Sequence, residues 1–477
     1  MWISFKLICS AVPCVTAVLA ATTVSPLLAQ IDDAVELVTT LQPPEGSLAQ
    51  GFGTSIAMDH GVVVLGAEWD SGRGSVYVFE QDADDPEQWR FASKLVPPSE
   101  TFQSFFGDCV DVDNDLIVVN APGGHGAVIY ERNDRGDWSQ VTYLRSSGNQ
   151  LYGGCVRIED DIALVGGEQS EDDGSSFQPA VFVFRRDAET PDTWRLVHTI
   201  KSPLPDEDGR FGFVFDLSDG QVVIPEWSGR TAYLFGRNAG GLDQWGLLAT
   251  LRMPSDVSTD ETFNGAVAIG DGVVAIGATF GRNSDFQPIG AVHVFEQVAF
   301  DPGFWRYAER LQPPSEGFSH YNHQIGADVA ISGRLLLAGT LRYGAHLFAK
   351  GALPGARWRY VTTIKEPEQL PGQAFGNAVA VSGATAIVGG DDIHPGGSGS
   401  LDRGLEPETA HIFQIVSVCS SDINRDNAVD TSDLGLFIRD FGSDAEQSDI
   451  NGDGVVDAGD LGLLLLEFGA TGCDTSR

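Results

Sequence analysis

The sequence predicts a mainly β fold: a seven-bladed β-propeller of four-stranded blades, closed by an N-terminal strand and followed by a small α-helical module. Three observations support this prediction. One unit of about 50–60 residues recurs seven times along the chain. A strand-like segment without a repeat of its own precedes the first copy, and a loop–helix pair is duplicated near the C-terminus. The expected domains are a signal peptide (1–29), the propeller (31–417) and the module (419–477).

The N-terminus resembles a secretory signal. Lys6 supplies positive charge, residues 7–19 are mostly apolar, and small residues follow, so that cleavage after either Ala20 or Ala29 fits. The apolar run is shorter than the about 18 residues of a membrane span, and no later stretch approaches that length. We therefore expect a secreted or extracellular protein without a transmembrane segment. An uncleaved N-terminal anchor is the alternative.

Each copy of the repeat begins with an aromatic–glycine step before its first strand. The steps are Phe52-Gly53, Phe106-Gly107, Tyr152-Gly153, Phe211-Gly212 and Phe375-Gly376, with Phe263-Asn264 in the fifth copy and Ile325-Gly326 in the sixth. A short turn then joins two alternating strands, a third strand ends in an aromatic residue, and a fourth begins at Trp89, Trp138, Trp194, Trp245, Trp305 or Trp358. Four strands in each of seven units predict the blades of a propeller, because one such sheet cannot bury both faces alone.

The two ends of the repeat region predict how the ring closes. The seventh copy has only three strands, the last of which ends at Phe413. The orphan segment Val35–Leu41 resembles Trp358–Ile364, the fourth strand of the sixth copy. We therefore expect residues 35–41 to complete the last blade, since the ring would otherwise expose an unpaired strand edge. A ring of six or eight blades is the alternative.

These phrases resemble the FG-GAP repeats of bacterial secreted proteins, above all residues 266–278 and 290–295. The resemblance implies a recognition propeller, as in integrin α-subunits, some of which carry Asp-x-Asp-x-Asp-Gly calcium loops. The hairpin turns here, such as residues 59–61 and 332–333, are too short for such a loop. Residues 111–115 look like one but occupy a hairpin position, so we interpret them as a turn with solvated acids.

Four cysteines remain after signal removal: Cys109, Cys155, Cys419 and Cys473. An even number in an exported chain favours two disulfides, for which three pairings are possible. Cys109 and Cys155 hold the same position in neighbouring copies, three residues after the aromatic of the step. Adjacent inner strands are expected to bring them together as a disulfide, and two buried free thiols are the alternative.

Two twelve-residue segments near the C-terminus have the spacing of calcium-binding loops. Oxygen donors stand at positions 1, 3, 5, 9 and 12, with a backbone carbonyl at position 7. The candidate ligands are Asp422, Asn424, Asp426, Ala428, Asp430 and Asp433 in the first loop, and Asp449, Asn451, Asp453, Val455, Asp457 and Asp460 in the second. Each loop runs into a similar helix, so we expect the module to bind two calcium ions and to depend on them for folding.

The duplicated loop–helix unit with Asp at position 12 resembles a type I dockerin. That resemblance implies attachment to a cohesin-like receptor or another cell-surface protein. Positions 10 and 11, which help to choose the partner in that family, are Thr431-Ser432 and Ala458-Gly459, and their difference argues against interchangeable two-way docking. Dockerin ends lie close together, which implies a Cys419–Cys473 disulfide.

Charge and motifs narrow the possible functions. The formal net charge is −38, which makes nucleic acid an improbable partner because its phosphates would be repelled. The sequence has no catalytic motif of the serine-hydrolase, zinc-protease or phosphate-loop kinds. Trp69 and Trp227 occupy matching places in copies one and four, on the face that should carry the long loops 168–179, 279–289 and 391–408. These tryptophans are candidate platforms for an extracellular glycan or protein, and packing residues without a ligand are the alternative.

The main hypothesis is a secreted non-catalytic adaptor, with a recognition propeller and a calcium-dependent tail for attachment. One alternative is a polysaccharide-degrading propeller enzyme or accessory protein that its dockerin targets, because acid pairs for glycoside hydrolysis are abundant in a chain with 67 acidic residues. The other is a structural protein of the cell envelope. Fold alone does not choose among them.

Overall fold

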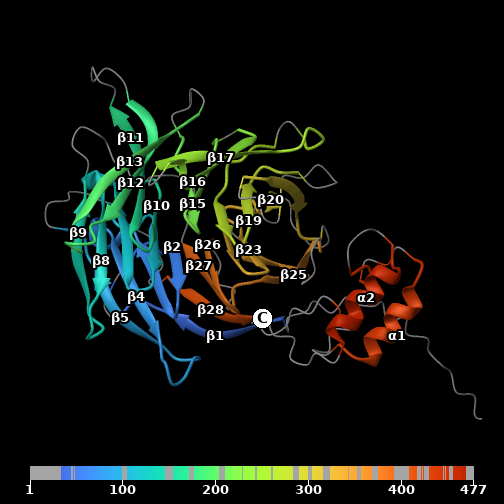
Figure 1. The fold of residues 1–477 in the computed structure, drawn as a ribbon. Helices are drawn as coiled ribbons and strands as arrows, with labels where there is room; N and C mark the ends of the chain where they lie inside the picture. The colour runs from blue at the N-terminus through green and yellow to red at the C-terminus, as the bar shows by residue number, and fades with distance from the viewer. Residues whose placement is uncertain are drawn as a thin grey trace, which may run out of the picture. The chain divides into compact units, whose positions relative to one another are not determined.

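Figure 1 shows the fold in a computed structural model of the chain. The described residues are 34–44, 47, 49–98, 105–145, 154–170, 177–203, 210–227, 229–241, 244–258, 261–282, 289–298, 303–314, 323–341, 343–351, 356–367, 374–391, 408–415, 421, 423, 429–443, 445, 447–450 and 455–468. The expected signal peptide lies outside them.

The described strands form seven four-stranded antiparallel sheets, one for each repeat. Blade 1 contains β2 (Phe52–Asp59), β3 (Val62–Ala67), β4 (Ser75–Gln81) and β5 (Trp89–Leu95). Blade 2 contains β6 (Val110–Asp113), β7 (Leu116–Ala121), β8 (Gly126–Arg132) and β9 (Trp138–Leu144). Blade 3 contains β10 (Val156–Glu159), β11 (Ile162–Ser170), β12 (Phe177–Arg186) and β13 (Trp194–Lys201).

Blade 4 contains β14 (Asp216–Ser218), β15 (Gln221–Pro225), β16 (Thr231–Gly241) and β17 (Gln244–Arg252). Blade 5 contains β18 (Val267–Gly270), β19 (Val273–Ala278), β20 (Ala291–Gln297) and β21 (Trp305–Leu311). Blade 6 contains β22 (Val329–Ser332), β23 (Leu335–Gly339), β24 (Ala345–Lys350) and β25 (Trp358–Ile364). Blade 7 contains β26 (Ala374–Ser382), β27 (Thr385–Asp391), β28 (Ala410–Ile415) and β1 (Val35–Leu41).

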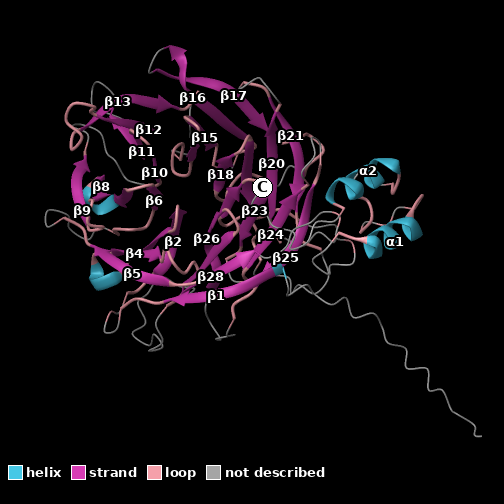
Figure 2. Ribbon diagram, turned by 60° about the horizontal axis from the view of Figure 1, so that its bottom comes forward, coloured by secondary structure: helices cyan, strands magenta, loops and turns pink. Residues whose placement is uncertain are grey.

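The seven sheets surround a central axis as the blades of a propeller. The first strand of each blade packs against the first strand of the next, and β2 packs against β26 to complete the circle. Figure 2 shows β9, β13 and β17 at the rim, with β6 and β10 nearer the centre. The N-terminal strand closes the ring as the sequence predicted, because β1 pairs antiparallel with β28, with Val35 opposite Ile415 and Leu41 opposite Ala410.

The strand boundaries follow the sequence signals closely, with two differences. Five of the fourth strands begin at the tryptophan that predicted them, whereas β17 begins one residue earlier, at Gln244. The expected long loop 168–179 is wrong at both ends, since β11 and β12 continue their pairing to Ser170 opposite Phe177. A polar strand extension has no apolar alternation to reveal it, which is why the loop seemed longer.

The hydrophobic core is divided among the seven seams between neighbouring blades. Each seam holds its own cluster of buried side chains, contributed by the two sheets that face each other. In the seam between blades 1 and 2, for example, Val64 and Val78 pack with Phe106 and Val119. A single blade would leave both faces in water, so the ring is stable only as a whole.

The aromatic–glycine step has a steric reason. A Cβ atom added to Gly66, on the second strand of blade 1, would collide with the carbonyl oxygen of Gly107, the glycine of the next step. The same contact recurs between Gly166 and Gly212, Gly277 and Gly326, Gly339 and Gly376, and Gly389 and Gly53. Neighbouring blades therefore approach so closely at this level that only glycine fits.

The turns between first and second strands tie one blade to the next. Asp59 of blade 1 accepts a hydrogen bond from the Asn114 backbone N–H at 2.8 Å, and Asp113 accepts one from Asp160 N–H at 2.7 Å. The interpretation of residues 111–115 as a turn holds only for Asn114 and Asp115, because residues 111–113 belong to strand β6, and the expectation that all their acids are solvated is wrong. Asp113 and Asp111 bind the backbone of blade 3.

The C-terminal residues form two short helices with matching surroundings. They are α1 (Thr431–Asp440) and α2 (Ala458–Glu467), and each is preceded by an aspartate N-cap. Their shared core consists of equivalent residues 27 positions apart, namely Ile423 with Ile450, Val429 with Val456, and Phe437 with Leu464. The sequence duplication is therefore also a structural one. Neither described helix is long and apolar enough to span a bilayer.

Candidate functional site

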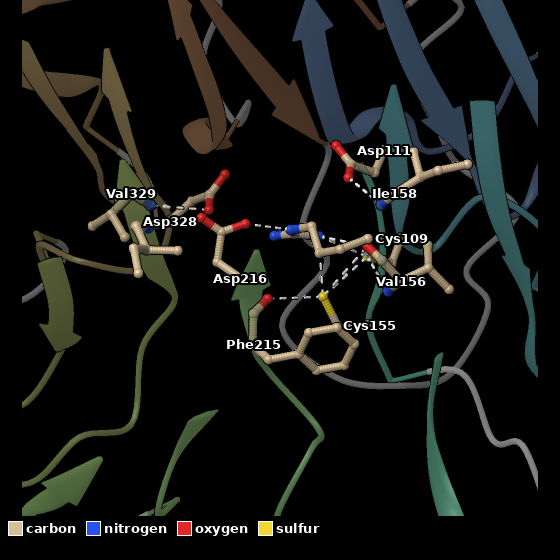
Figure 3. A network of polar contacts seen from close by, with 11 residues as sticks. Cys109, Asp111, Cys155, Val156, Ile158, Phe215, Asp216, Asp328 and Val329 are labelled. Atoms are coloured by element: carbon tan, nitrogen blue, oxygen red, sulfur yellow. Dashed lines mark hydrogen bonds and ion pairs between the residues drawn. The ribbon is translucent and has the colours of Figure 1, made fainter. Parts of the chain in front are cut away.

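A polar cluster lies beside the central axis, where the first strands of blades 2, 3 and 4 meet (Figure 3). Cys109 and Asp111 come from blade 2, Cys155 and Arg157 from blade 3, and Asp216 from blade 4. In each of blades 2 and 3 the two side chains are two residues apart along an extended chain, so they point to the same side. The alternation of the strand thus places both toward the neighbouring blade.

Arg157 is the centre of this cluster. Its Nε donates to Asp216 Oδ1 at 2.5 Å, and its Nη1 lies 3.1 Å from Cys155 Sγ and 3.5 Å from Cys109 Sγ. The Arg157 and Asp216 side chains are only 22% and 18% exposed. A charge pair so shielded from water is much harder to break on one side than an exposed pair, because the remaining charge keeps its desolvation cost.

The carboxylates near the axis bind the backbone of the next blade. Asp111 Oδ2 accepts from Ile158 N–H, and Asp216 Oδ2 accepts from Ile269 N–H, both at 2.8 Å. Asp328, which precedes β22 in blade 6, accepts from Val379 N–H of blade 7 at 2.8 Å. Each of these acids therefore acts as an inter-blade tie.

Burial perturbs Asp111 and Asp328. It raises the pKa of Asp111 to about 7, although Arg157 and the hydrogen bond from Ile158 oppose the change. It also raises the pKa of Asp328 to about 6, against the hydrogen bonds from Val379 and Val329. Perturbed acids occur in active sites and in structural networks alike, and the ties to neighbouring backbone give these two a structural role.

The expected Cys109–Cys155 pair is brought together, with Sγ atoms 3.5 Å apart, and both thiols are free in the structure. Burial disfavours a thiolate on Cys155, but the Cys109 thiol and Arg157 hold the pKa of Cys155 below its usual value. The same hydrogen bond and burial raise the pKa of Cys109. The disulfide stays a prediction, and Cys419 and Cys473 lie outside the described residues.

The two tryptophans of the expected ligand face each pack against an exposed phenylalanine. Trp69 is 45% exposed and meets Phe105 edge-on, with ring centroids 4.8 Å apart. Trp227 meets Phe213 in the same way at 5.8 Å, and the Arg210 guanidinium lies 5.6 Å from its ring centre. Residues 171–176, 283–288 and 392–407 of the neighbouring loops are outside the described residues, so ligand binding at this face stays a prediction.

The ends of both candidate calcium loops have equivalent geometry. Asp430, at position 9, is the N-cap of α1 and accepts from Ser432 N–H, while Asp433, at position 12, accepts from Asp430 N–H at 2.9 Å. Asp457 and Asp460 repeat these bonds before α2, with the position-12 bond at 2.8 Å. Such reciprocal caps fix the carboxylates of both positions at the start of each helix.

Burial of these carboxylates fits a cation site. Asp433 and Asp460 are completely buried, and Asp449, at position 1 of the second loop, is 8% exposed. Val455 has an exposed side chain, which leaves its backbone carbonyl as the candidate ligand. Buried carboxylates need hydrogen bonds, ion pairs or a metal, and a set of oxygen donors fits calcium.

The rest of the expected calcium ligands cannot be placed. Asp422, Asn424, Asp426, Ala428, Asn451 and Asp453 lie outside the described residues. Among the residues that are described, no group of three or more His, Cys, Asp or Glu side chains is arranged to hold a metal ion. Calcium binding therefore stays a proposal, supported by the geometry of positions 9 and 12.

The sequence prediction missed Asp111, Arg157, Asp216 and Asp328 as one polar network. Their signal was present, since the four other copies have alanine where Asp111, Arg157 and Asp216 stand: Ala57, Ala268, Ala330 and Ala380. A charged residue at a position where sister repeats have alanine is a local exception to the pattern. Aligning the seven first strands would have found it.

Comparison with known proteins gives one family match and several distant structural resemblances. Residues 36–79 match the FG-GAP repeat family, which confirms the resemblance for the first copy, and a search of curated proteins gave no match. Similar solved structures include the periplasmic gluconolactonase of Pseudomonas aeruginosa, with 13% identity over 65% of this chain and 89% of that one and a TM-score of 0.40. BamB from Moraxella catarrhalis has 11% identity over 76% of this chain and 85% of that one, with a TM-score of 0.41. A protein from Lactobacillus plantarum has 11% identity over 66% of this chain and 86% of that one, with a TM-score of 0.44. Nothing about the activity of this chain follows from resemblances at this level.

Proposed function

We propose that this chain is a secreted, non-catalytic adaptor whose propeller recognises an extracellular ligand or protein and whose C-terminal module binds two calcium ions and attaches to a cohesin-like or other surface receptor. The observation that carries the proposal is the duplicated pair of buried carboxylates, Asp433 and Asp460, at equivalent helix starts. A propeller with an FG-GAP repeat supports the recognition role.

The paired geometry favours calcium over ordinary helix capping. A capping aspartate is usually solvated, because water compensates its charge at little cost. Here the position-12 carboxylates are fully buried within a module that has only a small apolar core. A divalent cation would offset the burial of several carboxylates in each loop, and its binding energy would add to the stability of the module.

Calcium titration of the full-length mature chain tests this proposal. We expect two ions per chain by isothermal titration calorimetry, and one ion for either Asp433→Asn or Asp460→Asn. Asparagine keeps an oxygen that can accept the N-cap hydrogen bond, so the change removes charge and leaves the cap. Asp134→Asn, an exposed acid of the propeller, serves as the control. A chain that takes up no calcium would overturn the proposed role of the tail.

The adaptor role needs a second measurement. The full-length chain is used as bait against the envelope and secreted fractions of the producing cells, with calcium or with a chelator. We expect a protein that a chelator elutes and that the Asp433→Asn/Asp460→Asn double variant fails to retain. Equal recovery by the double variant would contradict calcium-dependent attachment and favour the structural envelope role.

The polysaccharide-degrading alternative receives less support from the described residues. Glycoside hydrolysis needs two carboxyl groups that flank a substrate, one to donate a proton and one to attack or activate water. The acids nearest the axis, Asp111, Asp216 and Asp328, each hold the backbone of a neighbouring blade. These three carboxylates therefore hold neighbouring blades together.

A further inference from the structure

Four seams of the ring share an ion pair between blades. In each, a cation of the third strand reaches an acid of the preceding blade: Arg132 with Glu80, Arg186 with Glu131, Arg237 with Asp161, and Lys350 with Glu296, at 2.6–3.0 Å. The seam between blades 4 and 5 has Gln297 at the cation position, and Gly236 where blades 1, 2 and 5 have glutamate. This seam therefore lacks such a cation, as do the two seams in which Gln81 and Ile415 stand at the same position.

A pocket lies at this place. It encloses about 240 Å³, including the part open to solvent, and its polar and aromatic lining includes Asp219 and Gln221 from blade 4 with Asp271, Gln297 and Trp305 from blade 5. Trp305 begins the fourth strand and is partly exposed, like Trp89 of blade 1, whose seam also lacks the cation, whereas Trp138, Trp194, Trp245 and Trp358 at the same position are buried. The missing ion pair and the opened tryptophan thus coincide.

The seam is well held elsewhere, so the pocket is not a sign of loose packing. Asp216 binds Ile269 N–H near the axis, and Phe263 N–H donates to Gly229 O at 2.7 Å. The Arg230 guanidinium donates to Pro254 O at 2.8 Å and to Glu261 O at 3.0 Å. These contacts hold the seam together around a gap that is confined to the turn side.

The residues that line the pocket favour a positively charged ligand that donates hydrogen bonds. Asp219 and Asp271 are exposed, and one oxygen of Asp271 is used by Gly333 N–H. The buried side-chain oxygen of Gln221 has no hydrogen-bond partner among the described residues. An aromatic ring beside carboxylates suits an ammonium or guanidinium group, which gains both ionic and cation–π attraction.

We propose that this pocket binds a basic side chain, arginine or lysine, of an extracellular partner protein. The guest cation would take the place that Arg132, Arg186 and Lys350 fill in other seams. The formal net charge of −38 would further attract a basic partner. The inference rests on the proposed recognition role of the propeller. It specifies a basic side chain as the group that binds beside the turns between first and second strands of blades 4 and 5.

The test is binding of the peptides acetyl-Gly-Arg-Gly-amide and acetyl-Gly-Lys-Gly-amide to the full-length chain, measured by calorimetry at low salt. The matched peptide with citrulline keeps the shape of arginine and loses its charge. We expect it to bind weaker by roughly fivefold or more. Equal binding of the citrulline peptide would overturn the proposal.

A second test uses a matched pair of variants, one of which places an arginine side chain in the pocket. Gln297→Arg places a cation at the position where other seams have one, and we expect loss of peptide binding. Gln81→Arg makes the same change at the equivalent position of blade 1, where Gln81 donates to Pro86 O. This control should bind the peptide like the parent chain. Unchanged binding by Gln297→Arg would overturn the assignment to this pocket.

The outcome is separable from that of the calcium tail. The Asp433→Asn/Asp460→Asn double variant should bind the arginine peptide normally, since neither residue belongs to the propeller. No peptide binding by a chain that still takes up two calcium ions would remove the pocket proposal and leave the tail proposal standing. Peptide binding without calcium uptake would remove the tail proposal and leave the pocket proposal standing.

Discussion

The two sides of the propeller axis differ sharply in chemistry although their backbones follow one pattern. At the same first-strand position, blades 2, 3 and 4 carry Asp111, Arg157 and Asp216, and the other blades carry alanine: Ala57, Ala268, Ala330 and Ala380. Four blades therefore form their inner strands without a charge at this position. The polar sector is an addition to the fold, and Asp328 of blade 6 interacts with it electrostatically.

Close packing between neighbouring blades is common to both sides of the ring. Glycine contacts at five seams and an apolar cluster at all seven recur around the circle. The seam between blades 4 and 5 departs from the glycine pattern, with Pro225 and Asn264 at the two glycine positions, and it also contains the pocket. Departures from the repeat thus mark the places where the ring carries additional chemistry.

The largest expected effect on the polar sector comes from Arg157→Met. Loss of the guanidinium leaves Asp216 shielded without its cation, and we expect a loss of about 3–5 kcal/mol in the free energy of unfolding. Urea unfolding near neutral pH measures it.

The control for Arg157→Met is Arg195→Met, which removes an exposed arginine of the outer strand β13. Arg195 is 67% exposed and pairs with Asp187, so its loss should cost less than about 1 kcal/mol. Adding Asp216→Asn to Arg157→Met should recover part of the stability. Equal effects of the two arginine changes would mean that the polar sector contributes no more than a surface pair.

The thiol pair provides the next largest effect. Oxidation of Cys109 and Cys155 would cross-link neighbouring blades 46 positions apart in the sequence. A loop of that length predicts a gain of about 2–4 kcal/mol in unfolding free energy. Urea unfolding with and without a reductant measures the gain, and Cys109→Ser should abolish the difference. Thiol counting on the denatured, unreduced protein decides whether the bond forms, and two reactive thiols from this pair would contradict it.

The sequence was sufficient for the ring and insufficient for the network inside it. Blade number, the closing strand and most fourth-strand starts follow from signals that lie within one repeat, such as Trp89 or the segment Val35–Leu41. The cluster of Asp111, Arg157 and Asp216 depends on residues from three repeats meeting at the axis, which no local pattern specifies. Asp111 was interpreted as a solvated turn residue because the turn was visible in the sequence and the neighbouring blade was not.

Asp111→Asn gives the smallest effect and the sharpest pH dependence. Burial raises the pKa of Asp111 to about 7, whereas an unfolded aspartate titrates near 3.9. The native state therefore holds this proton more tightly than the unfolded state, and its contribution to stability decreases as the pH rises from about 4 to about 7. Asparagine keeps an acceptor for Ile158 N–H and carries no charge.

We therefore expect Asp111→Asn and the parent chain to be similar in stability at about pH 4, and the variant to be more stable by roughly 1–3 kcal/mol at about pH 8. Urea unfolding across this range measures the difference. Asp115→Asn, at an exposed position in the adjoining turn, should show no such dependence. If the Asp111 variant were less stable than the parent at high pH, the ionised carboxylate would be a net stabilising partner of Arg157. The polar sector would then hold the blades together by charge, and the alanine-lined side would be the weaker half of the ring.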